Sequence, residues 1–139
     1  MSPIGQVRVV VLAACALSGV ACKSSTSTVA PSTSTATVVT DVFDGTLTPN
    51  GATTFPFNVS SSGTVYATLT TVADPAALVG FSLGTWNGAS CTIVIANDQA
   101  AQGTIVAGAA TGVGQLCVRV YDVGKVVDPL GYTITAVHP

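Results

Sequence analysis

From residue 38 to the end of the chain, turn residues divide the sequence into short segments rich in Val, Ile, Thr, Phe and Tyr. Several segments alternate apolar and polar residues, and Leu116, Val118 and Val120 fall on the same face of one of them. Strict alternation leaves each segment one face to bury, which is typical of half-buried β-strands. No window has a sustained helical period. The pattern therefore predicts an all-β fold.

The sequence predicts about eight strands, separated by turn signals such as Asn87-Gly88. They cover residues 38–43, 53–59, 64–72, 78–85, 91–96, 104–109, 115–121 and 132–137. Short strands at this spacing are typical of an antiparallel β-sandwich, of either the jelly-roll or the immunoglobulin-like kind. A single helical turn starting at Asp74-Pro75 is the one possible exception.

The N-terminal 21 residues have the parts of a secretory signal: a polar start with Arg8, an uncharged apolar run over residues 9–21, and small residues before Cys22. This run has 13 residues, whereas a membrane-spanning helix needs about 20. The ending Gly19-Val20-Ala21-Cys22 resembles the lipobox of bacterial lipoproteins, in which the cysteine is lipidated and becomes the new N-terminus. The resemblance implies acyl chains such as palmitate on Cys22, and Lys23 after it favours the outer membrane of a Gram-negative bacterium.

Cys15 is a second candidate for lipidation, because Leu12-Ala13-Ala14-Cys15 matches the lipoprotein pattern more closely. It would leave only residues 9–12 as the apolar region, and a signal needs about 7 to 15. We therefore favour Cys22. The alternative is an ordinary secretory signal cut near Ala21, which would leave Cys22 as an unpaired thiol in an oxidising compartment.

Residues 22–37 are rich in Ser and Thr and have too few large apolar side chains to form a core. We expect them to be a disordered tether between the signal (residues 1–21) and a β-sandwich domain (residues 38–139). Once residues 1–21 are removed, three bases (Lys23, Arg119 and Lys125) face six Asp, a formal net charge of −3. A weakly acidic domain without a basic stripe is poorly suited to bind phosphates, so we expect no nucleic-acid partner.

Cys91 and Cys117 fall in separate predicted strands. In an exported chain such a pair indicates a disulfide, and two buried free thiols are the alternative. The bridge would close a loop of 27 residues, worth about 3.5 kcal/mol in the chain-entropy model. Two cysteines and the single histidine, His138, are too few for a metal site, so we predict neither a metal nor a cofactor. His138 precedes the last residue and is expected to be a solvated chain end.

Five stretches between residues 42 and 137 occur in a recognisable order. They are Asp44-Gly45-Thr46-Leu47, Phe55-Pro56-Phe57-Asn58-Val59, Gly63-Thr64-Val65, Cys117-Val118-Arg119-Val120-Tyr121-Asp122 and Tyr132-Thr133-Ile134-Thr135. In this order they resemble bacterial pre-peptidase C-terminal domains, small β-sandwiches in which a "yyvrVy" strand precedes a "Ytltv" strand. The resemblance implies a stand-alone lipoprotein relative of domains that, when attached to proteases, are thought to assist secretion, substrate contact or calcium-dependent stability. The Asp-rich segment typical of the family is replaced here by Leu78-Val79-Gly80-Phe81-Ser82-Leu83, which counts against a calcium role and leaves calcium binding an open question.

Catalysis needs a nucleophile with a base, or paired acids, and the sequence offers one terminal His138 and scattered Asp. We therefore expect no enzyme. The sequence predicts a lipid-anchored cell-envelope protein whose sandwich is a non-catalytic interaction or structural module for an unknown envelope protein. The alternative is a carbohydrate-binding module in which Trp86 stacks on a sugar ring, with Asn87 and Tyr66 beside it. A lone Trp beside a disulfide is more often a core residue.

Overall fold

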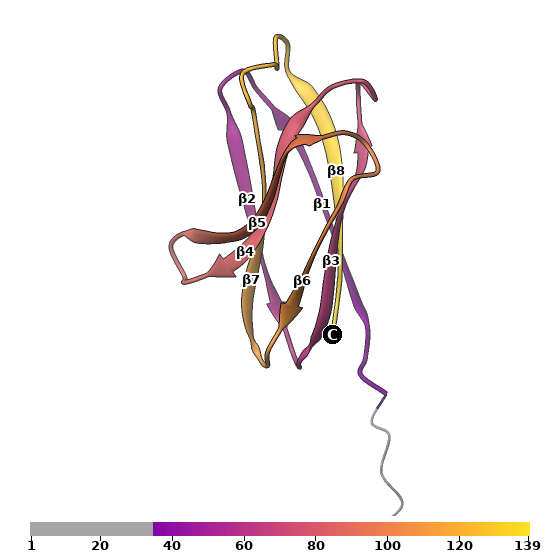
Figure 1. Ribbon diagram of the computed structural model, residues 1–139, viewed down its shortest axis with the longest axis vertical. Coiled ribbons are helices and arrows are strands. Elements are labelled where there is room, and N and C mark those ends of the chain that lie inside the picture. The colour runs from indigo at the N-terminus through magenta and orange to yellow at the C-terminus, as the bar shows by residue number, and fades with distance from the viewer. Residues whose placement is uncertain (1–34) are drawn as a thin grey trace, which may run out of the picture. The chain divides into compact units, whose positions relative to one another are not determined.

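The computed structural model describes residues 35–139, which form eight β-strands. They are β1 (Val39–Leu47), β2 (Ala52–Val59), β3 (Gly63–Val72), β4 (Val79–Trp86), β5 (Cys91–Ala100), β6 (Ile105–Ala110), β7 (Gly114–Tyr121) and β8 (Leu130–His138). Two four-stranded antiparallel sheets have the orders β1-β8-β3-β6 and β2-β7-β4-β5 (Figure 1). The predicted eight-stranded sandwich is confirmed, and each observed strand overlaps one predicted strand. The predicted signal, Cys15, Cys22 and most of the predicted tether lie outside the described residues.

The strands pair from the two ends of the domain inward: β1 with β8, β2 with β7, β3 with β6 and β4 with β5. Only β4 and β5 form a hairpin of consecutive strands, and all six remaining connections cross from one sheet to the other. The hairpin turn depends on Asn87, whose Oδ1 accepts hydrogen bonds from the N–H groups of Ala89 (2.9 Å) and Ser90 (2.8 Å). Eight strands paired in this way form a jelly roll, which decides between the two kinds of sandwich that the sequence allows.

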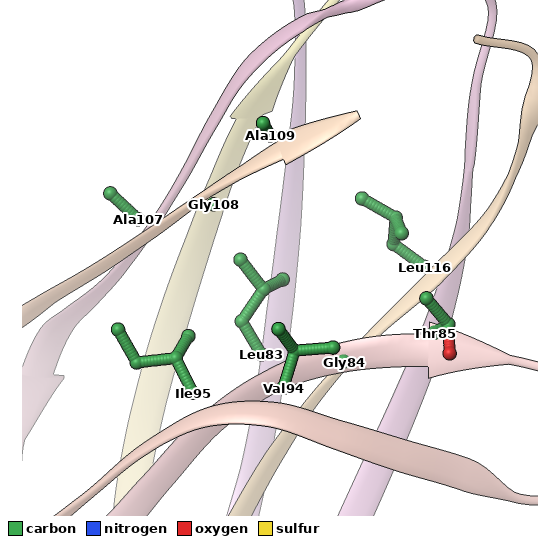
Figure 2. A pocket seen from close by; sticks show the side chains of 9 residues that line it. All are labelled: Leu83, Gly84, Thr85, Val94, Ile95, Ala107, Gly108, Ala109 and Leu116. Atoms are coloured by element: carbon green, nitrogen blue, oxygen red, sulfur yellow. The ribbon is translucent and has the colours of Figure 1, made fainter. Parts of the chain in front are cut away.

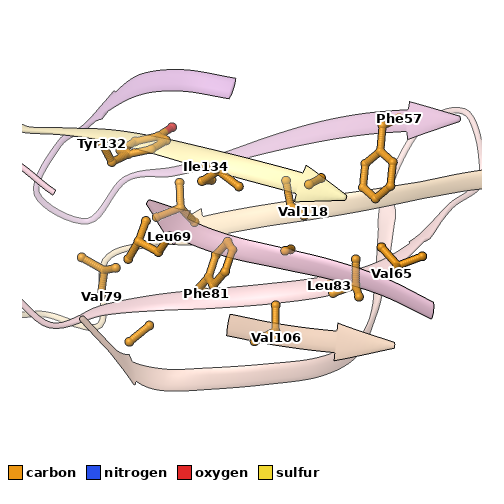
Figure 3. Close-up of a cluster of buried hydrophobic side chains, with 14 of the residues drawn as sticks. Phe57, Val65, Leu69, Val79, Phe81, Leu83, Val106, Val118, Tyr132 and Ile134 are labelled. Carbon is orange, nitrogen blue, oxygen red and sulfur yellow. The ribbon is translucent and has the colours of Figure 1, made fainter. Parts of the chain in front are cut away.

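The core lies between the two sheets and is filled by alternate residues of the strands (Figure 3). Val65, Ala67 and Leu69 of β3 have no exposed surface, and Val118 and Val120 of β7 face them from the other sheet, also fully buried. Burying one such aliphatic side chain contributes about 1.5–3 kcal/mol. The alternation seen in the sequence therefore fills much of the core. The expectation of one buried face per strand is wrong for β4, whose first six residues are all buried, because this strand lies between β7 and β5.

Aromatic side chains close the side of the sandwich that β1 and β2 border. The ring of Phe43 on β1 stacks on that of Phe55 on β2, with centroids 5.0 Å apart. Phe55 in turn meets Tyr132 of β8 edge to face at 6.4 Å, and Phe57 packs against His138 at 5.0 Å. Large rings from both sheets thus fill the space between these two edge strands.

His138 is not a solvated chain end, so that expectation is wrong. Only 3% of the residue is exposed, and its Nε2 lies 3.0 Å from Oδ2 of Asp41 on β1. The reason is the place of β8, which lies between β1 and β3 and continues through His138, where it pairs with Val39. The C-terminal segment is an interior strand of its sheet rather than a tail.

The turn at Asp74 forms, but it does not become a helix. The side-chain Oδ1 of Asp74 accepts a hydrogen bond from the N–H of Ala76 at 3.0 Å, and its carbonyl oxygen accepts one from Ala77 at 3.0 Å. Residues 35–139 contain no helix of the length and apolarity that crossing a membrane requires.

Candidate functional site

The predicted disulfide between Cys91 and Cys117 is present. It joins β5 to β7, although β4 lies between them in the sheet. Next-nearest strands of a flat sheet are about 9.5 Å apart, whereas the Cα atoms of these cysteines are 5.9 Å apart. The start of β5 therefore folds over β4. Gly84 of β4 permits this approach, because a Cβ there would lie 2.2 Å from the carbonyl oxygen of Thr92.

Strand β5 also loses the regular alternation of buried and exposed residues. The pairing of β5 with β4 shifts between Leu83 and Gly84, which leaves Val94 as an extra residue, a β-bulge. A second shift occurs near the end of β5. As a result three consecutive aliphatic residues reach the surface: Ile93 is 42% exposed, Val94 72% and Ile95 41%.

An apolar pocket of about 290 Å³ opens between the edge strands β5 and β6. It is lined by Leu83, Gly84, Thr85, Val94, Ile95, Ala107, Gly108, Ala109 and Leu116. Figure 2 shows Leu83, Val94 and Ile95 standing up from β4 and β5 toward β6, which presents Gly108 without a side chain. This volume is at the lower limit of small-molecule sites, about 300 Å³. Among the described residues, none of those that line this pocket is aromatic, in contrast to the aromatic closure at β1 and β2.

We call the surface formed by residues 92–96 of β5 and by β6 the open side. Its exposed aliphatic residues include Ile105, 58% of whose surface is accessible. None of the charged residues of the described chain lies in these two segments. The nearest along the chain, Asp98 of β5, accepts a hydrogen bond from the hydroxyl of Tyr121. Ile95 and Ile105 also line a second hollow, together with Asn97, Asp98 and Gln99. Exposed apolar residues beside a pocket commonly mark a site of interaction.

Tyr121 of β7 ties this part of β5 to its sheet. Its ring lies over Gly80 of β4, where a Cβ would come within 2.1 Å of the ring. Burial raises the pKa of Tyr121 to about 12, and the hydrogen bond to the Asp98 carboxylate adds to the rise. The Arg119 guanidinium lies 5.7 Å from the centroid of the Tyr121 ring.

Asp122 has a structural role at the end of β7. Its Oδ2 accepts a hydrogen bond from the N–H of Asn50 at 2.8 Å. Its Oδ1 accepts three more, from Gly124 and Lys125 at 2.8 Å and from Val126 at 3.0 Å. These bonds hold the pKa of the Asp122 carboxyl below its usual range, and the bond from Asn50 has the largest effect. Asp122 therefore fixes the loop before β8 to the turn between β1 and β2.

The structure does not bring the candidate carbohydrate residues together. Trp86 ends β4 in one sheet and is half-buried, whereas Tyr66 lies on β3 in the other sheet and is 48% exposed. The side chain of Asn87 is occupied in its own turn, because Nδ2 also donates to Oγ of Ser90 at 3.0 Å. The three residues thus form no single platform.

Within the described part of the chain, no three His, Cys, Asp or Glu side chains are close enough together to hold a metal ion. A comparison with known protein families finds no family model that matches the chain. No curated protein matches it either.

Sequence reasoning missed the open side. One signal was present: Ile93-Val94-Ile95 places three apolar residues in succession where a half-buried strand needs a polar one in the middle. Such a run also fits a strand buried on both faces. Only the position of β5 at the edge of its sheet shows that these side chains are exposed.

Proposed function

We propose that this chain is a lipid-anchored protein of the bacterial cell envelope, and that its jelly roll is a non-catalytic interaction module whose docking surface is the open side. The observation that carries the proposal is the uncharged cluster of exposed Ile93, Val94, Ile95 and Ile105 beside an apolar pocket. Leaving such side chains in water is unfavourable by about 25 cal/mol per Å² of apolar surface. A partner that covers them recovers this free energy.

Anchoring through Cys22 is the second part of the proposal. It is supported by the apolar run and the small residues before that cysteine. A lipid on Cys22 would hold the domain at the membrane, because each buried methylene contributes about 0.8 kcal/mol. The 13 residues 22–34 span at most about 45 Å when extended. The resemblance to pre-peptidase C-terminal domains belongs to the same proposal and suggests a stand-alone outer-membrane relative of them.

The anchoring is tested by the intact mass of the protein extracted from membranes, with Cys22→Ser and Cys15→Ser as a matched pair of variants. We expect the diacyl mass on the wild type and on Cys15→Ser, and its loss, with release from the membrane fraction, in Cys22→Ser. The opposite pattern would move the lipid to Cys15. A wild-type mass without any acyl group would refute the anchor.

The docking surface is tested by a photo-crosslinking amino acid placed at Val94 in the full chain in living cells. The matched control is the same amino acid at Val42, which is 57% exposed on β1, an edge strand of the other sheet. We expect covalent protein adducts from position 94 and none from position 42. The absence of adducts from position 94, or equal adducts from both, would contradict the proposal.

A further inference from the structure

The sandwich has four edge strands, and three of them carry features that oppose pairing with another chain. Natural edges are protected by charges, proline or bulges. The outer strand β1 carries Asp41 and Asp44, and β2 carries Pro56 in its middle. The third, β5, has two bulges and Asp98. Each of these edges is therefore a poor template for a further strand.

The fourth edge, β6, has no such protection. Its sequence, Ile105–Ala110, contains neither a charge nor a proline. Its pairing with β3 runs without a shift over all six residues. The Ala and Gly residues of β6 are small and also let another backbone come close. Within residues 35–139, β6 is the regular edge strand that is open to a new partner.

A strand added to β6 would also cover the pocket. Val106 and Ala110 face the core and are buried, so alternate residues of β6 point between the sheets. The pocket lies between this strand and β5. Inward side chains of an added strand would therefore lie over Val94 and Ile95. Strand pairing and burial of the exposed aliphatic residues would occur in one contact.

The distribution of charge on the domain indicates which kind of partner the open side would bind. The described domain has six Asp against Arg119 and Lys125, so two copies carry net charge of the same sign. A basic partner would be attracted to β1 with its two Asp rather than to β6. Residues 92–96 and β6 are uncharged, so two copies can meet there without opposing like charges. Asp98 lies beside this surface, in a hollow that it shares with Ile95 and Ile105, and it accepts a hydrogen bond from Tyr121. The open side of a second copy is itself uncharged and apolar.

We propose that β6 pairs antiparallel with β6 of a second copy and joins two four-stranded sheets into one of eight strands. Residues directly opposite on antiparallel strands point to the same face. A two-fold axis at Gly108 sets that residue opposite itself, Ala107 opposite Ala109, and Val106 opposite Ala110. No opposed pair is charged, and each includes at least one small residue. This inference names the partner of the docking surface and rests on the proposed function.

The test uses the full chain with two different affinity tags, co-expressed and extracted in mild detergent. Ala107 and Ala109 are exposed, so paired lysines there place like charges opposite each other across the two-fold axis. We expect wild-type copies to co-purify, and the variant Ala107→Lys, Ala109→Lys to co-purify with itself at least about tenfold less. Mixing it with Ala107→Glu, Ala109→Glu should restore co-purification, which a misfolded variant would not do.

The matched control is Thr40→Lys, Val42→Lys, two exposed positions on β1 with the same spacing, which should co-purify like the wild type. The inference is overturned if wild-type copies do not co-purify, or if the paired lysines on β6 have no effect. If position 94 then captures a different protein, the inference fails and the docking surface stands. If it captures nothing, both fail.

Discussion

Removing the disulfide should lower the free energy of unfolding by about 3.5 kcal/mol, the chain-entropy value for cross-linking Cys91 to Cys117 across 26 positions. The perturbation is the double variant Cys91→Ala, Cys117→Ala. The bridge holds the start of β5 over β4, so its loss also frees the hairpin end from β7. Both effects act in the same direction, the first on the unfolded chain and the second on the native one.

The assay is equilibrium unfolding of the full chain in urea, followed by circular dichroism. For a domain of this size each 1 kcal/mol corresponds to about 4–8 °C in Tm, so the Tm should fall by about 14–28 °C. The slope of the urea transition should rise, because the unfolded chain without the cross-link exposes more surface. Reducing the wild-type protein with a thiol reagent is the independent control and should give the same loss.

A loss below about 1 kcal/mol with an unchanged slope would refute this reasoning. It would mean that the unfolded chain is already compact around these residues. Equal losses from the double variant and from reduction, with a raised slope, would support it.

Three further predictions concern single residues. Gly84→Ala should destabilise the domain by about 1–3 kcal/mol, because its Cβ would collide with the carbonyl oxygen of Thr92. Gly112→Ala, in open space, should leave the stability unchanged, and equal urea midpoints for the two variants would contradict this reasoning. Stability should fall between pH 10 and 12, where the unfolded state releases the Tyr121 proton that the folded state keeps, and Tyr121→Phe should lack that fall in pH-dependent unfolding. Asp122 should stabilise above pH 3.8 and lose this effect as the pH drops through its lowered pKa, so the wild type and Asp122→Asn should converge in acid.

The strands and their buried faces were predictable because they depend on local alternation. Val118 and Val120 are buried as their spacing requires, and Arg119 between them is not. The disulfide was predictable from two cysteines in separate predicted strands, together with the expectation that the N-terminal apolar run is an export signal. The burial of His138 was not predictable, because a histidine near the chain end has the same local sequence whether β8 is an interior strand or an edge. The role of Asp122 also depended on a contact with Asn50, far from it in the chain.

The sequence by itself determined that this chain folds into β-strands, most of which bury one face, and that two cysteines are available to join them. It did not show that β4 is buried on both faces. The tertiary structure alone decided which strands are neighbours, because jelly-roll pairing joins positions as distant as Val39 and His138. It also decided which strands lie at an edge. The exposure of Val94 and the unprotected edge of β6 follow from that arrangement, since the same residues inside a sheet would be core.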